Sequence, residues 1–308
     1  MEYIAGNTNF KYNNSAVTLG KFDGLHLGHQ LLMNQVISYK KQGYTAIMFS
    51  FLLHPSNLFS DKEFELIYTE EEKRARLKKS GLDVLISYPF TEETRNMEPE
   101  AFIREILVEK LDAKIIVIGN DYRFGRQRRG DTGLLQKYED TYGYKVIVCE
   151  KKKWNNTIIS SSAIRNKLKE GNMEVVNAML GKPYSIRGEV IHGRRIGRTL
   201  GMPTTNLIPE STKLLPPYGV YVTKTLVGDT YYPGVTNIGF KPTVGDEELK
   251  GVETFLFDVD LDLYGKVIEV ELLSFLRQEL KFSSLEELQQ QMQEDIVFAK
   301  TYIKGTFI

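Results

Sequence analysis

The chain has 308 residues, and its 40 basic and 40 acidic side chains give a formal net charge of zero. This balance gives no sign of a surface for nucleic acid or membranes, and no run is apolar for long enough to cross a bilayer. Cys149 is the only cysteine, so no internal disulfide can form. We expect a cytoplasmic protein whose length favours two domains.

Apolar runs alternate with amphipathic runs in the first half of the chain. This pattern predicts a parallel α/β sheet with helices on both faces. Thr69 and Glu72 have the spacing of a capping box, and Pro99 suits the first turn of a helix. The predicted strands span 16–19, 45–51, 83–88, 115–118 and 145–149, and the predicted helices span 28–41, 69–81, 99–111, 163–169 and 173–180.

The pattern changes after Gly181-Lys182-Pro183. Short strand-like runs separated by glycine and proline then predict a small antiparallel barrel. One final helix is expected, capped by Ser283-Ser284, with an apolar stripe from Leu285 to Ile303. We therefore predict two domains, 1–182 and 183–308. The predicted barrel strands span 184–191, 219–226, 231–237, 254–261 and 267–275.

Polar clusters of the first half follow predicted strands. In a parallel sheet, ligands bind outside the carboxyl ends of the strands, so these clusters should meet at one edge. They comprise 20–29 after the first strand, His54-Pro55 after the second, 119–125 after the fourth and 160–165 after the fifth.

His26 and His29 flank Gly28 where a loop enters a helix. Both imidazoles can then point toward one group at the helix N-terminus, and a phosphate undergoing transfer would be stabilised there. The simpler alternative is that His26 caps the helix and His29 is a solvated surface residue. For Arg126 and Arg128 we prefer a solvated loop.

The segment 160–165 could hold nucleotide phosphates through its hydroxyl and backbone N–H groups and Arg165, although ordinary helix capping by serine explains it equally well by itself. Together, His26-Leu27-Gly28-His29, Ser161-Ser162 and Arg165 resemble the HxGH nucleotidyltransferase superfamily. With 119–125, they resemble in particular the prokaryotic bifunctional riboflavin kinase/FMN adenylyltransferase (FAD synthetase) family. Ser162 replaces the usual threonine, Tyr122 the usual phenylalanine and Leu53 the usual proline.

This resemblance implies that His26 and His29 stabilise the α-phosphoryl group of ATP as FMN attacks it, with Arg165 as a further catalytic residue. It also implies that Asn120 binds the flavin. The nucleotide-binding residues that it implies are Gly20, Phe22, Asp23, Gly24, Gly28, Asp121, Ser161 and Ser162.

A second glycine-rich segment, 193–206, lies in the barrel half. The chain lacks both GxxxxGK[ST] and GxGxxG, so an ATP site here would use neither common phosphate loop. Glycines allow a backbone to approach phosphates closely. Thr204 and Asn206 share a face of an extended strand, and their oxygens suit Mg²⁺. A glycine-rich hairpin with surface arginines explains the segment equally well.

The end of this segment, Pro203-Thr204-Thr205-Asn206, resembles the Pro-Thr-Ala-Asn signature of riboflavin kinases, with Thr205 and Met202 as departures. The resemblance implies that Thr204 and Asn206 hold Mg²⁺, and that Glu253 is the general base, whereas by itself Glu253 would be interpreted as an exposed strand residue. It implies Arg277 and Phe282 as flavin-binding residues, and Gly193, Gly197, Arg198, Gly201 and Pro203 as nucleotide-binding residues.

The resulting hypothesis is that the chain phosphorylates riboflavin with ATP and then adenylylates FMN to FAD, releasing pyrophosphate. The ligands expected are riboflavin, FMN, FAD, ATP and Mg²⁺, without nucleic acid or membrane. The alternatives are a riboflavin kinase with a silent first domain, a non-catalytic flavin-binding regulator, and an adenylyltransferase for another substrate. The presence of both residue sets favours two activities. The sequence indicates no oligomeric state.

Overall fold

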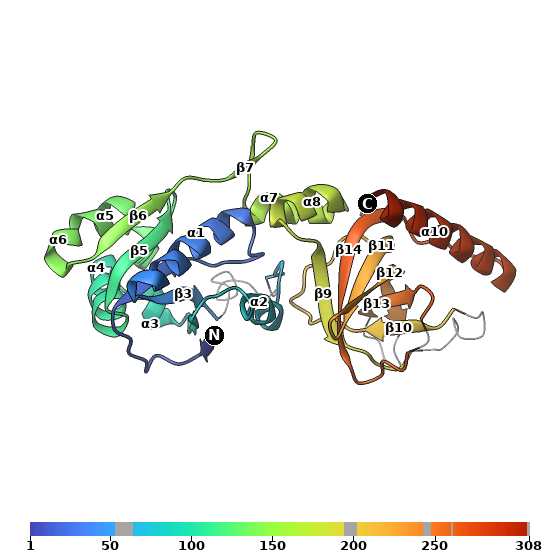
Figure 1. The fold of residues 1–308 in the computed structure, drawn as a ribbon, viewed down its shortest axis with the longest axis horizontal. Coiled ribbons are helices and arrows are strands. Elements are labelled where there is room, and N and C mark those ends of the chain that lie inside the picture. Colours follow the sequence, from blue (N-terminus) through green and yellow to red (C-terminus); the bar gives the residue numbers. More distant parts are fainter. Residues whose placement is uncertain (53–63, 194–201, 243–247, 260, 307–308) are drawn as a thin grey trace. The chain divides into compact units, whose positions relative to one another are not determined.

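The protein is described by a computed structural model that covers residues 1–52, 64–193, 202–242, 248–259 and 261–306 (Figure 1). The chain forms two compact units, Met1–Ser161 and Ser162–Ile308. Each unit has its own six-stranded sheet, parallel in the first and antiparallel in the second. The prediction of an α/β domain followed by an antiparallel β domain with a C-terminal helix is confirmed.

The first unit is built on a parallel sheet with the strand order β1-β4-β3-β2-β5-β6. Strands β2, β3 and β4 are almost wholly buried, as expected for a sheet covered on both faces. Strand β1, a short and half-exposed edge strand, was not predicted from the sequence. The strands are β1 (Glu2–Ala5), β2 (Ser15–Leu19), β3 (Thr45–Phe51), β4 (Val84–Tyr88), β5 (Ala113–Gly119) and β6 (Lys145–Cys149), with a separate hairpin of β7 (Lys153–Trp154) and β8 (Thr157–Ile158).

Alternate residues of the central strands face opposite cores. Val17 packs against one helical layer with Ile106, whereas Ala16 faces the other layer with Val36. The capping box at Thr69 and Glu72 is present, although its helix ends at Leu77, before Gly81. The helices are α1 (Leu27–Ser38), α2 (Glu70–Leu77), α3 (Glu92–Asn96), α4 (Pro99–Ala101), a π-helical segment (Phe102–Lys110), α5 (Thr132–Lys137) and α6 (Glu139–Tyr142), with 3-10 turns at Tyr39–Gln42 and Arg126–Arg128.

The second unit has an antiparallel sheet with the strand order β10-β13-β12-β11-β14-β9. Ile191, just after β9, bridges Asn206 of β10 through a backbone hydrogen bond of 2.9 Å. This bridge joins the two edges of the sheet, which curves it into a barrel. The strands are β9 (Tyr184–Glu189), β10 (Thr204–Leu207), β11 (Gly219–Val227), β12 (Thr230–Pro242), β13 (Glu248–Leu256) and β14 (Val267–Arg277).

Two helices precede this sheet, α7 (Ser161–Lys169) and α8 (Met173–Leu180). Asn177 of α8 donates to Leu272 O of β14 at 2.9 Å and accepts from Tyr184 N at 2.7 Å. These bonds attach α8 to the sheet. The compact second unit therefore begins before the predicted boundary at residue 182, which marks the start of the antiparallel sheet.

The C-terminal helix α10 (Leu285–Thr306) covers the sheet with part of its predicted stripe. Ile296 and Ala299 are buried in a core with Val222 of β11. Ser284 Oγ accepts from Glu287 N at 3.2 Å, as expected for an N-cap. Leu285 is exposed, however, so the stripe begins later than predicted.

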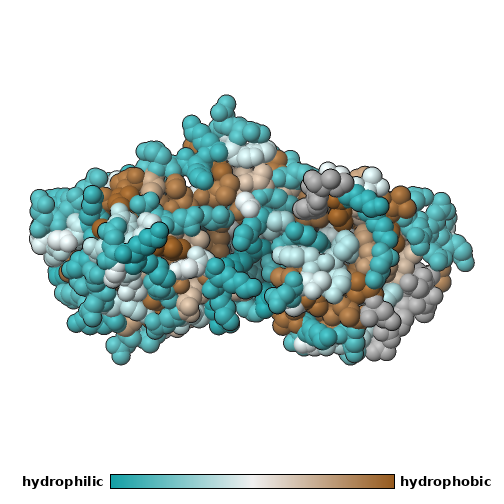
Figure 2. All heavy atoms as spheres, in the orientation of Figure 1, coloured by the Kyte–Doolittle hydropathy of each residue, from teal (hydrophilic) through white to brown (hydrophobic). Residues whose placement is uncertain are grey.

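In the described part of the chain, no helix is long and apolar enough to cross a membrane. On the visible face of each unit, hydrophilic side chains surround separate hydrophobic patches (Figure 2).

Candidate active sites

The histidine pair lies where the loop after β2 enters α1. His26 is the N-cap of the helix, and its Nδ1 accepts from His29 N at 3.3 Å. The two rings stack with centroids 3.6 Å apart. A Cβ on Gly28 would lie 3.1 Å from the His26 ring, so a small residue is needed between them. His26 does cap the helix, as the simpler alternative expects, but His29 is a partner in a ring stack rather than a solvated residue.

Both imidazoles are neutral near pH 7. Burial lowers the pKa of His26 to about 4. Burial also lowers the pKa of His29 well below 6.5, helped by His26 and by the positive charge of Lys73. Because Nδ1 of neutral His26 accepts a hydrogen bond, its proton lies on Nε2. The pair therefore offers uncharged N–H donors at a helix N-terminus, where a phosphate is favoured.

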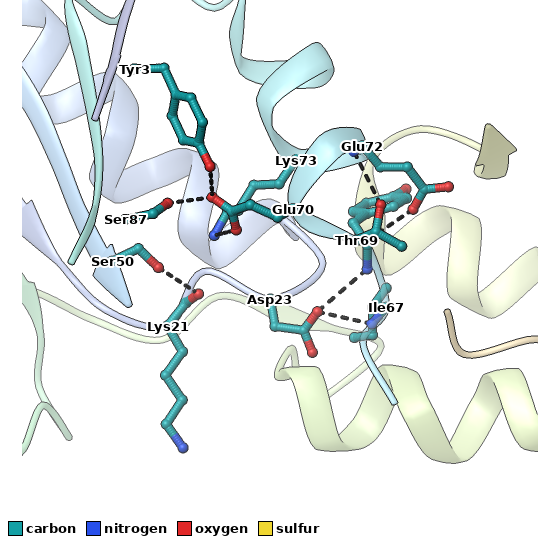
Figure 3. A network of polar contacts seen from close by, with 11 residues as sticks. Tyr3, Lys21, Asp23, Ser50, Ile67, Thr69, Glu70, Glu72, Lys73 and Ser87 are labelled. Atoms are coloured by element: carbon teal, nitrogen blue, oxygen red, sulfur yellow. Dashed lines mark hydrogen bonds and ion pairs between the residues drawn. The ribbon is translucent and has the colours of Figure 1, made fainter. Parts of the chain in front are cut away.

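The histidine loop is attached to the start of α2 (Figure 3). Asp23 Oδ1 accepts from Ile67 N at 2.9 Å and from Tyr68 N at 3.4 Å. Gly24 has φ +87°, and a Cβ there would lie 3.0 Å from Ile67 Cδ1. Ser161 Oγ donates to Asp23 O at 2.8 Å. The Asp23 carboxylate thus braces the loop, and a role in nucleotide binding stays a prediction.

A buried ion pair on α2 lies near the histidines. Lys73, which is 6% exposed, pairs with Glu70 at 2.6 Å, and Glu70 also accepts from Tyr3 and Ser87 (Figure 3). This cluster was not predicted from the sequence, because a run of charges on a helix is typical of a solvated face. Only the fold reveals that α2 buries its charged side toward β4.

The other residues predicted to bind at the carboxyl ends of the first-unit strands are either packed around the histidines or held in polar contacts. Phe22 is buried, and its ring contacts His29 with centroids 5.2 Å apart; a Cβ on Gly20 would lie 3.2 Å from the same ring. Asn120 donates to Glu150 at 2.7 Å, and Asp121 pairs with Lys151 at 2.8 Å.

Ser162 and Arg165 lie in α7, which belongs to the second unit from Ser162 onward. Their participation in the histidine site stays a prediction. His54-Pro55 falls outside the described residues.

A cavity of about 340 Å³ in the first unit combines aromatic and basic side chains. Tyr122 and Phe124 stack with centroids 5.6 Å apart, and Phe51 meets Phe90 edge-on at 4.9 Å. None of its described lining residues is acidic. Such a cavity fits a planar aromatic ligand that carries negative charge. The aromatic lining is Phe51, Phe90, Phe102, Tyr122 and Phe124, and the basic lining is Lys21, Arg95, Arg123 and Arg128.

In the second unit, Thr204 and Asn206 of β10 lie beside Glu253 of β13. Asn206 is directly opposite Glu253 in the sheet, and Thr204 Oγ1 donates to the Glu253 carboxylate. Glu253 is half-buried, so its interpretation as an exposed strand residue is wrong. The structure brings together the predicted general base and the two predicted metal ligands.

Two cavities share Thr204 as a lining residue. One, of about 390 Å³, is lined by Gly193, Pro203 and Asn206, and a Cβ on Gly193 would lie 2.4 Å from Asn206 Nδ2. The other, of about 330 Å³, is lined by Glu253, Arg277 and Phe282 among apolar side chains. The predicted nucleotide and flavin residues are thus divided between two adjoining cavities.

Three of the predicted nucleotide-binding residues, Gly197, Arg198 and Gly201, fall outside the described residues.

The structure reveals a fixed partner for Arg277. Its Nε donates to Asp295 Oδ1 at 2.9 Å, and its Nη2 donates to Oδ2 at 2.7 Å. Asp295 is 3% exposed and lines the same cavity as Arg277. Asp295 was not predicted from the sequence, because it lies far along α10 and belongs to no local motif.

The fold and the sites define a two-unit protein with a nucleotidyltransferase-like histidine loop and a barrel that carries a candidate phosphoryl-transfer site. The family model "FAD synthetase" matches residues 9–163, and the family model "Riboflavin kinase" matches residues 180–303. The chain belongs to the family of bifunctional riboflavin kinase/FMN adenylyltransferases.

Relatives with the name "Bifunctional riboflavin kinase/FMN adenylyltransferase" match along almost the whole chain. One from Buchnera aphidicola subsp. Acyrthosiphon pisum is 37% identical over 98% of this chain and 98% of its own. One from Escherichia coli K12 is 35% identical over 93% and 92%. A solved structure titled "Macrolide-efflux Protein" from Streptococcus pneumoniae has a TM-score of 0.86 at 28% identity, and the match covers 97% of this chain and 98% of that one.

Proposed function

We propose that the chain makes flavin cofactors in two ATP-dependent steps, phosphorylation of riboflavin to FMN in the second unit and adenylylation of FMN to FAD in the first. The observation that carries the proposal is the contact between Thr204 and Glu253 where the two barrel cavities adjoin. Family membership and the neutral histidine pair support the second step.

For the kinase step, ATP occupies the cavity of Gly193 and Asn206, and riboflavin occupies the more apolar cavity. Glu253 takes the proton of the ribityl hydroxyl as the hydroxyl oxygen attacks the γ-phosphorus of ATP, and ADP leaves. The hydroxyl of Thr204 and the amide oxygen of Asn206 are hard ligands that fit Mg²⁺. When bound, Mg²⁺ would neutralise charge on the phosphates.

For the adenylylation step, FMN occupies the aromatic-basic cavity of the first unit. A phosphate oxygen of FMN bonds to the α-phosphorus of ATP, and the bond to pyrophosphate breaks. His26 and His29 donate to the phosphoryl oxygens as negative charge builds up. Gly20 and Lys21, which precede the histidines, line the same cavity. The side chain of Lys21 points away from the polar contacts that Asp23, Glu70 and Glu72 make at α2 (Figure 3).

The test is product analysis with riboflavin and Mg-ATP, on the wild type and on variants that remove one step each. Glu253→Gln should lower FMN formation by about 10²- to 10⁴-fold and keep FAD formation from supplied FMN. His26→Ala should lower FAD formation by about 10²- to 10³-fold and keep FMN formation. Glu189→Gln, at an exposed glutamate in the second unit, is the matched control.

The alternatives predict other products in this assay. FMN as the sole product of the wild type would indicate a kinase whose first unit is silent or adenylylates another substrate, and no product would indicate a flavin-binding regulator. FAD formation at the wild-type rate in His26→Ala would refute the role of the histidine pair. A cytoplasmic location and the absence of nucleic-acid and membrane partners stay predictions.

A further inference from the structure

The loop between Phe124 and Gly130 is held at several points. These two residues exchange backbone hydrogen bonds of 3.0 and 2.9 Å, and Arg126 N donates to Met97 O at 2.7 Å. Gly125 has φ +69°, and a Cβ there would lie 2.7 Å from Pro99 Cγ, so the loop contacts the start of α4 closely. The backbone of this loop is therefore held in one conformation by the fold.

Three arginines of this region are neutralised by carboxylates. Arg123 pairs with Asp131 at 2.5 Å, and Arg126 and Arg129 both pair with Glu98. Arg128 differs: within the described residues its guanidinium forms no ion pair and no side-chain hydrogen bond, and its side chain lines the aromatic-basic cavity.

The backbone at this point is unfavourable for residues that carry a Cβ. Gln127 has φ +53° and Arg128 has φ +59°, two successive left-handed residues of which neither is glycine. Such conformations persist only where the surrounding structure imposes them, and they cluster at ligand sites. Here the hydrogen bonds between Phe124 and Gly130 close the loop that contains these residues, and Gln127 and Arg128 both line the cavity.

We propose that Arg128 is a substrate-binding residue that selects the phosphorylated flavin for adenylylation. The inference rests on the proposed function of the first unit. The lining is aromatic and basic without a described acidic residue, so it matches FMN, a planar ring joined to a phosphate dianion, better than uncharged riboflavin. Both arginines are exposed, as the solvated-loop interpretation expects, but only Arg128 lines the cavity, whereas Arg126 pairs with Glu98.

The experiment is steady-state kinetics of FAD formation from FMN and Mg-ATP by full-length Arg128→Met, Arg128→Lys and Arg126→Met. In Arg128→Met the KM for FMN should rise about 10- to 100-fold, the usual effect of losing a hydrogen bond to a charged group. The KM for ATP and kcat should stay within about threefold, because bound FMN is held for attack by other groups. Arg128→Lys should recover part of the loss, and Arg126→Met should behave as wild type.

Urea denaturation followed through Trp154 reports whether the first unit of each preparation is folded, and Arg128→Gln replaces the methionine variant if that variant does not fold. An unchanged KM for FMN in folded Arg128→Met would overturn the inference. So would an equal rise in Arg126→Met, or a matching rise in the KM for ATP. A wild type that forms no FAD from FMN would refute the proposed adenylylation as well, which distinguishes the two failures.

Discussion

The buried imidazole of His26 should make the first unit sensitive to mild acid. Burial lowers its pKa from 6.5 to about 4. Between these values the unfolded chain binds a proton that the folded chain does not, so this contribution to stability is complete above pH 6.5 and is lost as the pH falls toward 4. Integrated from pH 7 to pH 5, the free energy of unfolding falls by about 2 kcal/mol for this residue. The pKa of His29 is also lowered, so His29 acts in the same direction.

The assay is urea denaturation followed through Trp154, the only tryptophan of the chain, which lies in the first unit. His26→Gln is the matched variant, because its amide oxygen can accept from His29 N but does not titrate. Between pH 7 and pH 5, the wild type should lose about 2 kcal/mol more unfolding free energy than the variant. Equal losses in the two proteins would refute the assignment of the acid sensitivity to His26.

Three further predictions concern the second unit. Asp295→Asn leaves the half-buried Arg277 guanidinium without its counter-charge, so it should destabilise this unit by up to about 3 kcal/mol in chemical denaturation, and an unchanged midpoint would contradict a structural ion pair. Gly193→Ala places a Cβ against Asn206. The variant should raise the KM for ATP in the kinase assay at least about tenfold, while FAD formation from supplied FMN persists. Wild-type kinase kinetics would show that the close contact is unimportant. The fragment 162–308 should fold and keep riboflavin kinase activity, and circular dichroism should show it to be more stable than 183–308, which lacks α7 and α8. Equal stability would mean that neither helix stabilises the sheet.

Local patterns in the sequence were sufficient for most of the elements and for placing His26 and His29 at one helix N-terminus. Strand β6 and helix α8 were predicted with the bounds that the structure has. Hydrophobic periodicity and capping depend on neighbours within a few residues, so they can be recognised without a fold. His26 and His29 lie together for the same reason. They are three positions apart at the start of a helix, and this spacing brings both side chains to the same end of it.

Only the tertiary structure decided how residues far apart in the chain meet. Asp295 reaches Arg277 across the contact between α10 and β14, and Lys73 is buried because α2 turns its charged side toward the sheet. The aromatic-basic cavity gathers side chains from strand β3, helix α3, the π-helical segment and the segments that follow β2, β4 and β5. Pairing in these cases depends on sheet register and on which face of a helix is covered, and these are set by the packing of the whole unit. A charged or aromatic residue has the same local sequence signal whether that packing leaves it in solvent or places it in the wall of a binding site.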